Sequence, residues 1–130
     1  MSSRVQHILT ILAVKNLPKS ISFYTEVFGW EQIVNVPVYA EFKIPGGMRL
    51  GLYERKSFAL NVGKVPICTI TNELAPTELY FYVDDIEVAI GKFKKAKAMV
   101  LSGLSRRDWG DEAAYFADPD GNVIVLAHPL

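Results

Sequence analysis

Short apolar segments separated by turn residues dominate the first half of the chain. His7–Val14 is rich in Ile, Leu, Val and Thr, which predicts a strand buried on both faces. Asn16 can cap a helix that ends at Gly29, because apolar residues recur between them at helical spacing. Three further strands are expected at Trp30–Val38, Tyr39–Ile44 and Met48–Glu54. The predicted order is therefore β-α-β-β-β.

The second half of the chain repeats this order. A strand at Glu78–Val83 precedes a helix over about Asp85–Ala96, with Asp85 as its N-cap. The remaining strands are a short one near Met99, then Glu112–Ala117 and Asn122–Ala127. Each half thus has its own helix and its own group of strands.

Matching residues show that the two halves form an internal repeat. The pattern A-x-F-x-x-P-x-G-x-x-x-x-L occupies residues 40–52 and recurs at 114–126, 74 residues later. The first strand and helix of each half recur after 69 residues, and loops of unequal length can absorb the difference at little cost. We therefore expect a single domain over residues 1–130, with modules at about 5–55 and 77–130.

The segment between the modules, at about 56–76, has no clear periodicity. Its turn-forming residues are Gly63, Pro66, Asn72 and Pro76. Its middle, Val65–Ile70, is apolar. Loops of about 20 residues in compact domains are usually functional or mobile, so we expect this one to pack over a cavity mouth or a partner chain.

Two motifs give this repeat a family resemblance. Residues 16–24 read NLPKSISFY and are followed by Val27-Phe28-Gly29, and residues 118–122 read DPDGN. Together with the paired modules, they resemble the vicinal oxygen chelate superfamily of glyoxalase I, bleomycin-resistance proteins and extradiol dioxygenases. The resemblance spans nearly the whole chain. It implies an α+β fold in which two βαβββ modules form a curved, eight-stranded mixed sheet around a small-molecule site, and it implies a homodimer.

Enzymes of this superfamily usually hold a divalent metal with one side chain from each of four strands. The resemblance places these ligand positions at Leu9, Gly51, Glu78 and Val125. The repeat supports the alignment, since 9 plus 69 is 78 and 51 plus 74 is 125. Only Glu78 could bind a metal, whereas a useful site needs about three protein ligands. We therefore expect neither this metal nor another cofactor.

A relocated metal site is the alternative. Other potential ligands are His7, Glu41, Glu54 and His128, on the same strands or on neighbouring ones. Glu54 and His128 are an odd number of residues from the family's ligand positions on their strands. Because successive side chains of a strand point to opposite faces, both should point away from the site. This arrangement disfavours a relocated site.

Period-two alternation also predicts the lining of the site. The side chains expected on the same face as the ligand positions are Ile11, Arg49, Tyr53, Tyr80, Tyr82 and Val123. Phe42 and Phe116 are expected beneath the helices, which leaves Glu41 and Tyr115 facing the site. Such an aromatic lining with few charges suits a planar or apolar ligand.

Trp109 lies beside Arg106 and Arg107 in a loop before the penultimate strand. One interpretation makes this loop a lid over the ligand. The other makes it a solvated, partly ion-paired connection. The predicted ligand-binding residues are therefore Arg49, Tyr53, Tyr80, Tyr82, Trp109 and Tyr115.

Glu78 is the candidate catalytic residue. In an apolar, aromatic setting without a metal, desolvation should raise the pKa of this carboxyl group, and it could act as a general acid or base. The alternative is structural: Glu78 pairs with Arg49 or accepts hydrogen bonds from tyrosine hydroxyls.

Composition narrows the class of protein. Fourteen Lys and Arg balance fourteen Asp and Glu, so no global field would attract nucleic acid or a membrane surface. No apolar run approaches the roughly 18 residues of a transmembrane helix. The single Cys68 and the lack of a basic segment before an apolar stretch favour a reducing, cytoplasmic location. Cys68 has apolar neighbours, so we expect a buried or semi-buried filler.

Three functions remain open from the sequence. The first is a small-molecule-binding protein of the glyoxalase/bleomycin-resistance type, which holds an aromatic or apolar ligand in a metal-free cup. The second is a metal-independent isomerase, lyase or hydrolase that uses Glu78 as acid or base. The third is a metal-dependent glyoxalase or dioxygenase, which the missing ligands disfavour.

Overall fold

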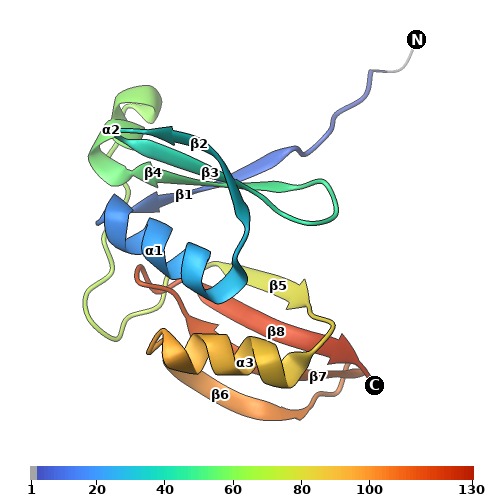
Figure 1. Ribbon diagram of the computed structural model, residues 1–130. Coiled ribbons are helices and arrows are strands. Elements are labelled where there is room, and N and C mark those ends of the chain that lie inside the picture. Colours follow the sequence, from blue (N-terminus) through green and yellow to red (C-terminus); the bar gives the residue numbers. More distant parts are fainter. Residues whose placement is uncertain (1–2) are drawn as a thin grey trace. The chain divides into compact units, whose positions relative to one another are not determined.

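The structure is a computed structural model that describes residues 3–130 (Figure 1). One sheet has the order β1-β4-β3-β2 and the other β5-β8-β7-β6. The first contains β1 (Leu9–Val14), β2 (Glu31–Val36), β3 (Tyr39–Lys43) and β4 (Arg49–Glu54). The second contains β5 (Glu78–Tyr82), β6 (Met99–Arg106), β7 (Asp111–Ala117) and β8 (Val123–Pro129). The helices are α1 (Leu17–Phe28), α2 (Arg55–Val62) and α3 (Ile86–Lys95).

The α+β class and the two βαβββ modules are confirmed. The eight expected strands are present, and they form two hydrogen-bonded sheets of four rather than one continuous sheet. In each sheet the first strand pairs in parallel with the last strand of its module, and the other pairs are antiparallel. Corresponding strands thus occupy corresponding places in the two sheets.

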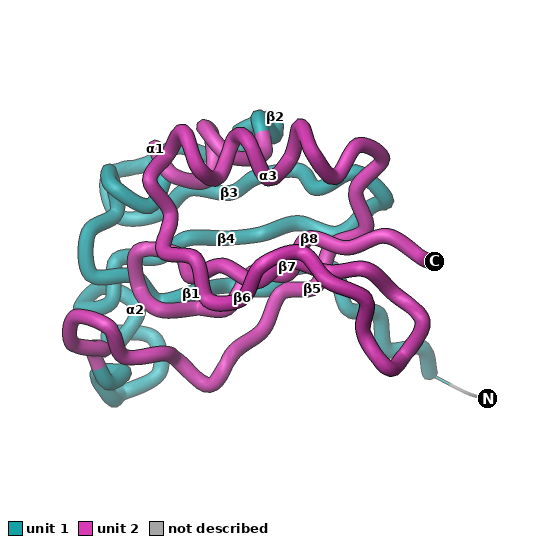
Figure 2. The backbone as a smooth tube through the Cα atoms, turned by 90° about the horizontal axis from the view of Figure 1, so that it is seen from below, with its two compact units in different colours: residues 1–21, 29–67 teal, residues 22–28, 68–130 magenta. Residues whose placement is uncertain are grey.

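The chain divides into two compact units that do not follow the repeat (Figure 2). The first unit holds the chain up to Ile21 together with Gly29–Ile67. The second holds Ser22–Phe28 and Cys68–Leu130. The later turns of α1 therefore belong with the sheet of the second module, although they are encoded in the first.

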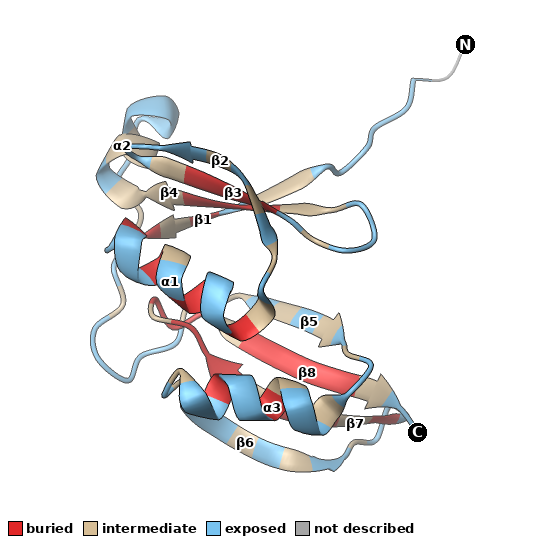
Figure 3. Cartoon of the chain, in the orientation of Figure 1, coloured by how far each residue is buried: buried red, intermediate tan, exposed pale blue. Residues whose placement is uncertain are grey.

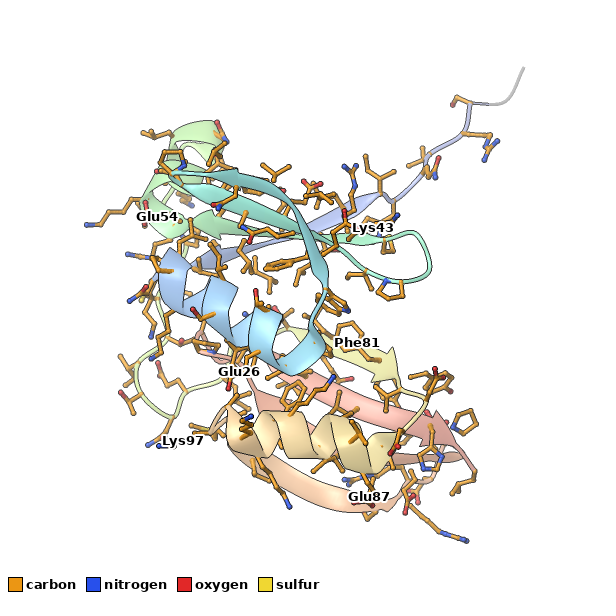
Figure 4. All side chains as sticks on the ribbon, in the orientation of Figure 1. Glu26, Lys43, Glu54, Phe81, Glu87 and Lys97 are labelled. Atoms are coloured by element: carbon orange, nitrogen blue, oxygen red, sulfur yellow. The ribbon has the colours of Figure 1, made fainter. Side chains whose placement is uncertain are left out.

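Helix α2 lies where the sequence predicted only a connecting loop. The Glu54 carboxylate caps it by accepting hydrogen bonds from the backbone N–H groups of Lys56, at 2.9 Å, and Ser57, at 3.0 Å (Glu54 is labelled in Figure 4). The helix ends at Gly63, whose φ of 80° is left-handed. None of its residues is buried, so its sequence lacks the apolar stripe that would reveal a helix. The connecting loop is correspondingly shorter than expected.

Aromatic side chains build much of the core of the second unit. Phe93 of α3 is buried against Phe116 of β7, with ring centroids 4.8 Å apart. Phe28 of α1 packs on both Phe93, at 5.4 Å, and Phe81 of β5, at 4.8 Å. Burial in this unit runs along β8 (Figure 3). The predicted placement of Phe116 beneath a helix is confirmed.

Asp118 fixes the turn between β7 and β8. One oxygen of its carboxylate accepts hydrogen bonds from the backbone N–H groups of Asp120, at 2.9 Å, and Asn122, at 2.8 Å. The other accepts from the Asn122 side-chain amide at 2.9 Å and from the Tyr24 hydroxyl of α1 at 2.6 Å. Burial raises the pKa of Asp118 even though all these hydrogen bonds lower it. The DPDGN motif therefore has a structural role.

The segment before β5 is attached to this same turn. The Thr69 hydroxyl donates to the Asp120 carbonyl oxygen at 2.8 Å, and the Ala75 N–H donates to that of Gly121 at 2.9 Å. A Cβ at Gly121 would collide with the Glu73 carbonyl oxygen, and its φ of 82° also favours glycine. Cys68 is exposed, so the expected apolar burial of this thiol is wrong. In residues 3–130, no helix has the length and apolar character needed to cross a membrane.

We predict that Tyr24→Phe lowers the free energy of unfolding by about 1–3 kcal/mol, because a buried carboxylate loses a hydrogen-bond donor. Urea denaturation followed by circular dichroism measures this loss. Tyr115→Phe is the matched control, since the Tyr115 hydroxyl makes no hydrogen bond within residues 3–130. Equal effects of the two substitutions would contradict the role given to Tyr24.

Candidate functional site

A buried carboxylate organises one face of the first sheet. Glu41 of β3 is only 5% exposed. One of its oxygens accepts a hydrogen bond from the Tyr39 hydroxyl at 2.6 Å, and the other pairs with Arg49 Nη1 at 2.9 Å. Burial and the hydrogen bond to Glu41 raise the pKa of Tyr39, so this hydroxyl is a neutral donor. The prediction that Glu41 and Arg49 share a face is confirmed.

Gly51, at one of the family's metal-ligand positions, lies beneath Tyr39. A Cβ at Gly51 would collide with the Tyr39 hydroxyl and would approach Ile11 Cγ1 to 2.9 Å. The tyrosine therefore fills the space that a longer side chain at this position would need. The sequence predicted the loss of a ligand here, but it did not indicate what replaces it.

Tyr53, another predicted ligand-binding residue, is partly covered within the first unit. Its ring packs against Tyr39 at 5.2 Å and against Phe58 of α2 at 5.9 Å. Its hydroxyl accepts a hydrogen bond from Asn61 Nδ2 at 3.0 Å. Arg49 and Tyr53 thus belong to one packed polar and aromatic network.

A second buried carboxylate organises the corresponding face of the second sheet. Asp111, which begins β7, is 5% exposed and accepts hydrogen bonds from the Tyr80 hydroxyl at 2.5 Å and the Tyr82 hydroxyl at 3.0 Å. Trp109 Nε1 donates to the Tyr80 hydroxyl at 2.8 Å. We call Tyr80, Tyr82 and Trp109 the aromatic row. They are 38%, 64% and 57% exposed, respectively.

The strand register explains how the two tyrosines of β5 reach Asp111. They extend across β8, where Tyr80 pairs with Val125 and Tyr82 pairs with Ala127. Val125, Ala127 and Ala113 form a buried apolar cluster of modest volume beneath them. Burial is the main cause that raises the pKa of Tyr80, and the hydrogen bond to Asp111 is the main cause for Tyr82. Both hydroxyls are therefore protonated donors near neutral pH.

The connection between β6 and β7 is a tight turn rather than a free loop. The Arg107 N–H donates to the Asp111 carbonyl oxygen at 2.8 Å, and the Gly110 N–H donates to that of Arg107 at 3.3 Å. The Arg107 guanidinium lies over the Tyr115 ring, with its carbon 4.9 Å from the ring centroid. Both Tyr115 and Arg107 thus have defined places on this face. Whether Trp109 covers a ligand stays a prediction.

Glu78 begins β5 on the same face as Tyr80 and Tyr82, and it is exposed. The apolar setting expected for its carboxylate is therefore absent. Its predicted structural partners are engaged elsewhere, since Arg49 pairs with Glu41 and the two tyrosines bind Asp111. A role for Glu78 as an acid or base stays a prediction.

Sequence reasoning missed Asp111, which organises the aromatic row. The strand predicted from the sequence begins one residue later, at Glu112, which places Asp111 in the preceding loop. Its spacing was the available signal: Asp111 is four residues before Tyr115 and shares its strand face.

The residues present do not fit the divalent metal of the superfamily. Leu9, Gly51 and Val125 have no donor side chain. Among residues 3–130, no group of three or more His, Cys, Asp or Glu side chains lies together in a way that could hold a metal ion. His128 pairs with Glu112 at 2.9 Å, and His7 contacts Thr10 at 3.0 Å. The side chains at these positions therefore do not make up the donor set expected for that metal.

Comparison with known proteins places the chain in a family. The family model of the glyoxalase-like domain matches residues 7–130. The chain belongs to this family and, with it, to the vicinal oxygen chelate superfamily. It is 31% identical over 119 residues to metallothiol transferase FosB of Lysinibacillus sphaericus, covering 91% of this chain and 77% of that protein. A Staphylococcus haemolyticus protein of the same name is 27% identical over 114 residues, covering 88% and 76%.

Solved structures share the fold. A glyoxalase/bleomycin resistance protein/dioxygenase from Nocardioides has a TM-score of 0.82 at 20% identity, covering 100% of this chain and 87% of that one. A glyoxalase-related enzyme from Fulvimarina pelagi has a TM-score of 0.79 at 22% identity, covering 94% and 86%. At these identities the likeness supports the fold alone.

We predict that Gly51→Ala lowers the free energy of unfolding by about 1–3 kcal/mol, because the added methyl group forces Tyr39 to move. Thermal or urea unfolding measures the loss, and a Tyr39→Ala background should reduce it. Gly103→Ala is the matched control, because Gly103 also lies in a strand and a Cβ there meets no atom within 4 Å. A Gly51 substitution as mild as the control would contradict the packing argument.

We also predict that the untagged protein retains far less than one equivalent of Zn²⁺, Ni²⁺ or Mn²⁺ after incubation and dialysis, because the donor set is incomplete. Elemental analysis by mass spectrometry measures the retained metal. Glu78→Ala should leave that amount unchanged. One equivalent in the parent protein that disappears in this variant would show that a metal binds at the superfamily's position after all.

Proposed function

We propose that this protein binds a small aromatic organic molecule on the aromatic row of the second sheet, without a metal ion. The observation that carries the proposal is the hydrogen-bonded order of three exposed aromatic side chains around a buried carboxylate. Exposed rings normally lose side-chain entropy when a ligand orders them. Asp111 already orders Tyr80 and Tyr82, and Tyr80 orders Trp109. Binding a ligand therefore costs less side-chain entropy here.

The chemistry of this face suits a planar ligand. Ala113, Val125 and Ala127 are fully buried and form the packed layer of the sheet beneath this face. The rings of Tyr80 and Tyr82 stand nearly edge to face, 6.1 Å apart at an angle of 68°. Apolar contact and ring packing would contribute most of the binding energy. A few polar groups at the edges would set the orientation of the ligand.

Binding without reaction is favoured over metal-dependent transfer. The similar FosB proteins are named metallothiol transferases, and that name implies a metal. Three of this chain's four equivalent positions have no donor side chain, and Tyr39 fills the space above one of them. A binding role requires only the shape and polarity of the site, and the residues present can supply both.

We predict that Asp111→Ala weakens binding of an aromatic ligand about tenfold or more, because Tyr80 and Tyr82 lose their common acceptor. A thermal-shift screen of aromatic compounds identifies a ligand, and calorimetry then measures its Kd with each variant. Glu112→Ala is the matched control, since it removes the neighbouring carboxylate from the opposite face of β7. Equal affinity in the parent and Asp111→Ala proteins, or no ligand from the screen, would overturn the proposal.

A further inference from the structure

Arg107 is a positively charged side chain without a carboxylate partner. Within residues 3–130, no Asp or Glu oxygen lies within salt-bridge distance of its guanidinium group. The group is partly buried, and its Nε is enclosed without a hydrogen-bond acceptor. Enclosing the Nε donor without an acceptor costs free energy, so an arginine in this position needs a reason.

The guanidinium is nevertheless held firmly in place. Its Nη2 donates to the Ser102 hydroxyl at 3.0 Å and to the carbonyl oxygens of Gly103 and Ala113, both at 2.9 Å. Its central carbon lies over the Tyr115 ring, 4.9 Å from the ring centroid. All three acceptors are uncharged, so they fix the direction of the group and leave its charge uncompensated. Nη1 has no acceptor within the described chain and retains both of its N–H donors.

The strand register places this cation beside the aromatic row. Tyr80 pairs with Val125, and Val125 pairs with Tyr115, so the two tyrosines lie at one level on either side of β8. Neighbouring strands are about 4.8 Å apart, which sets Tyr80 and Tyr115 about 10 Å apart across the sheet. Arg107 stands on Tyr115 at the far side of this span. The span suits a molecule with an aromatic ring and an acidic group a few bonds away.

We propose that Arg107 binds the carboxylate of an aromatic acid whose ring lies on the aromatic row. This inference rests on the proposed function and names the chemical class of its ligand. A carboxylate at Nη1 gains a charge-assisted hydrogen bond and neutralises the unpaired cation. The two carboxylates of this face favour a ligand whose acidic group lies at Arg107. Asp111 already accepts hydrogen bonds from two hydroxyls. Glu78, at the start of β5, would repel an acidic group placed near it.

A matched pair of ligands tests this assignment. Calorimetry measures the Kd of 3-phenylpropanoate and of its uncharged amide with the parent protein and with Arg107→Gln. The parent should bind the acid at least about tenfold more tightly than the amide, since a charge-assisted hydrogen bond contributes about 1.5–3 kcal/mol. Arg107→Gln should lose that preference and bind the amide within about twofold of the parent.

Control variants keep the outcomes separable. Arg106→Gln removes an exposed neighbouring charge and should leave the preference intact, which excludes a general effect of net charge. If Arg107→Gln does not fold, Arg107→Lys should still lose most of the preference, because an ammonium group lacks the planar fork. Equal binding of acid and amide by the parent overturns the role of Arg107 and leaves the aromatic site standing. If neither the acid nor the amide binds, the proposed aromatic site is overturned together with the role of Arg107.

Discussion

The buried carboxylate of Asp118 is the constraint on which the second unit depends. It joins the hydroxyl of Tyr24, encoded in the first module, to the turn between β7 and β8. Burial of a charge costs several kcal/mol, and hydrogen bonds to a charged group each return about 1.5–3 kcal/mol. Four such bonds offset the cost of burying Asp118 at the point where α1 meets its sheet. The turn between β7 and β8 then sets the positions of Val125 and of the rest of β8.

The two sheets hold their buried polar groups in a similar way. In each, a nearly buried carboxylate accepts hydrogen bonds from tyrosine: Glu41 from Tyr39, and Asp111 from Tyr80 and Tyr82. The pKa of each of these tyrosines is raised, so the phenols remain donors near neutral pH. The outcomes differ because Arg49 completes the first network by pairing with Glu41, whereas the aromatic row of the second stays exposed. This difference is the reason for proposing the binding site on the second sheet rather than on the first.

Local patterns were sufficient to predict most of the elements. Asn16 and Asp85 cap α1 and α3 as expected, through hydrogen bonds to the N–H groups of Lys19 and Val88. These signals are local, because a cap and its helix are adjacent in sequence. Helix α2 was missed because it buries no side chain and so has no apolar stripe. The side chains that share one strand face, such as Tyr80 and Tyr82, were also predictable, since alternation along a strand depends only on residue number.

The superfamily and the two modules could be read from the amino-acid sequence, because both follow from which residue types stand at which spacing. Only the tertiary structure decided which partners these side chains have. Arg49 forms an ion pair with Glu41, and the tyrosines of β5 donate hydrogen bonds to Asp111 rather than to Glu78. These contacts depend on the register of the strands, on small residues such as Ala127 beneath the rings, and on the direction in which each side chain extends across the neighbouring strand. The tyrosines and Asp111 are about 30 residues apart in sequence, and Arg49 and Glu41 lie on different strands, so these contacts form only when the strands pair.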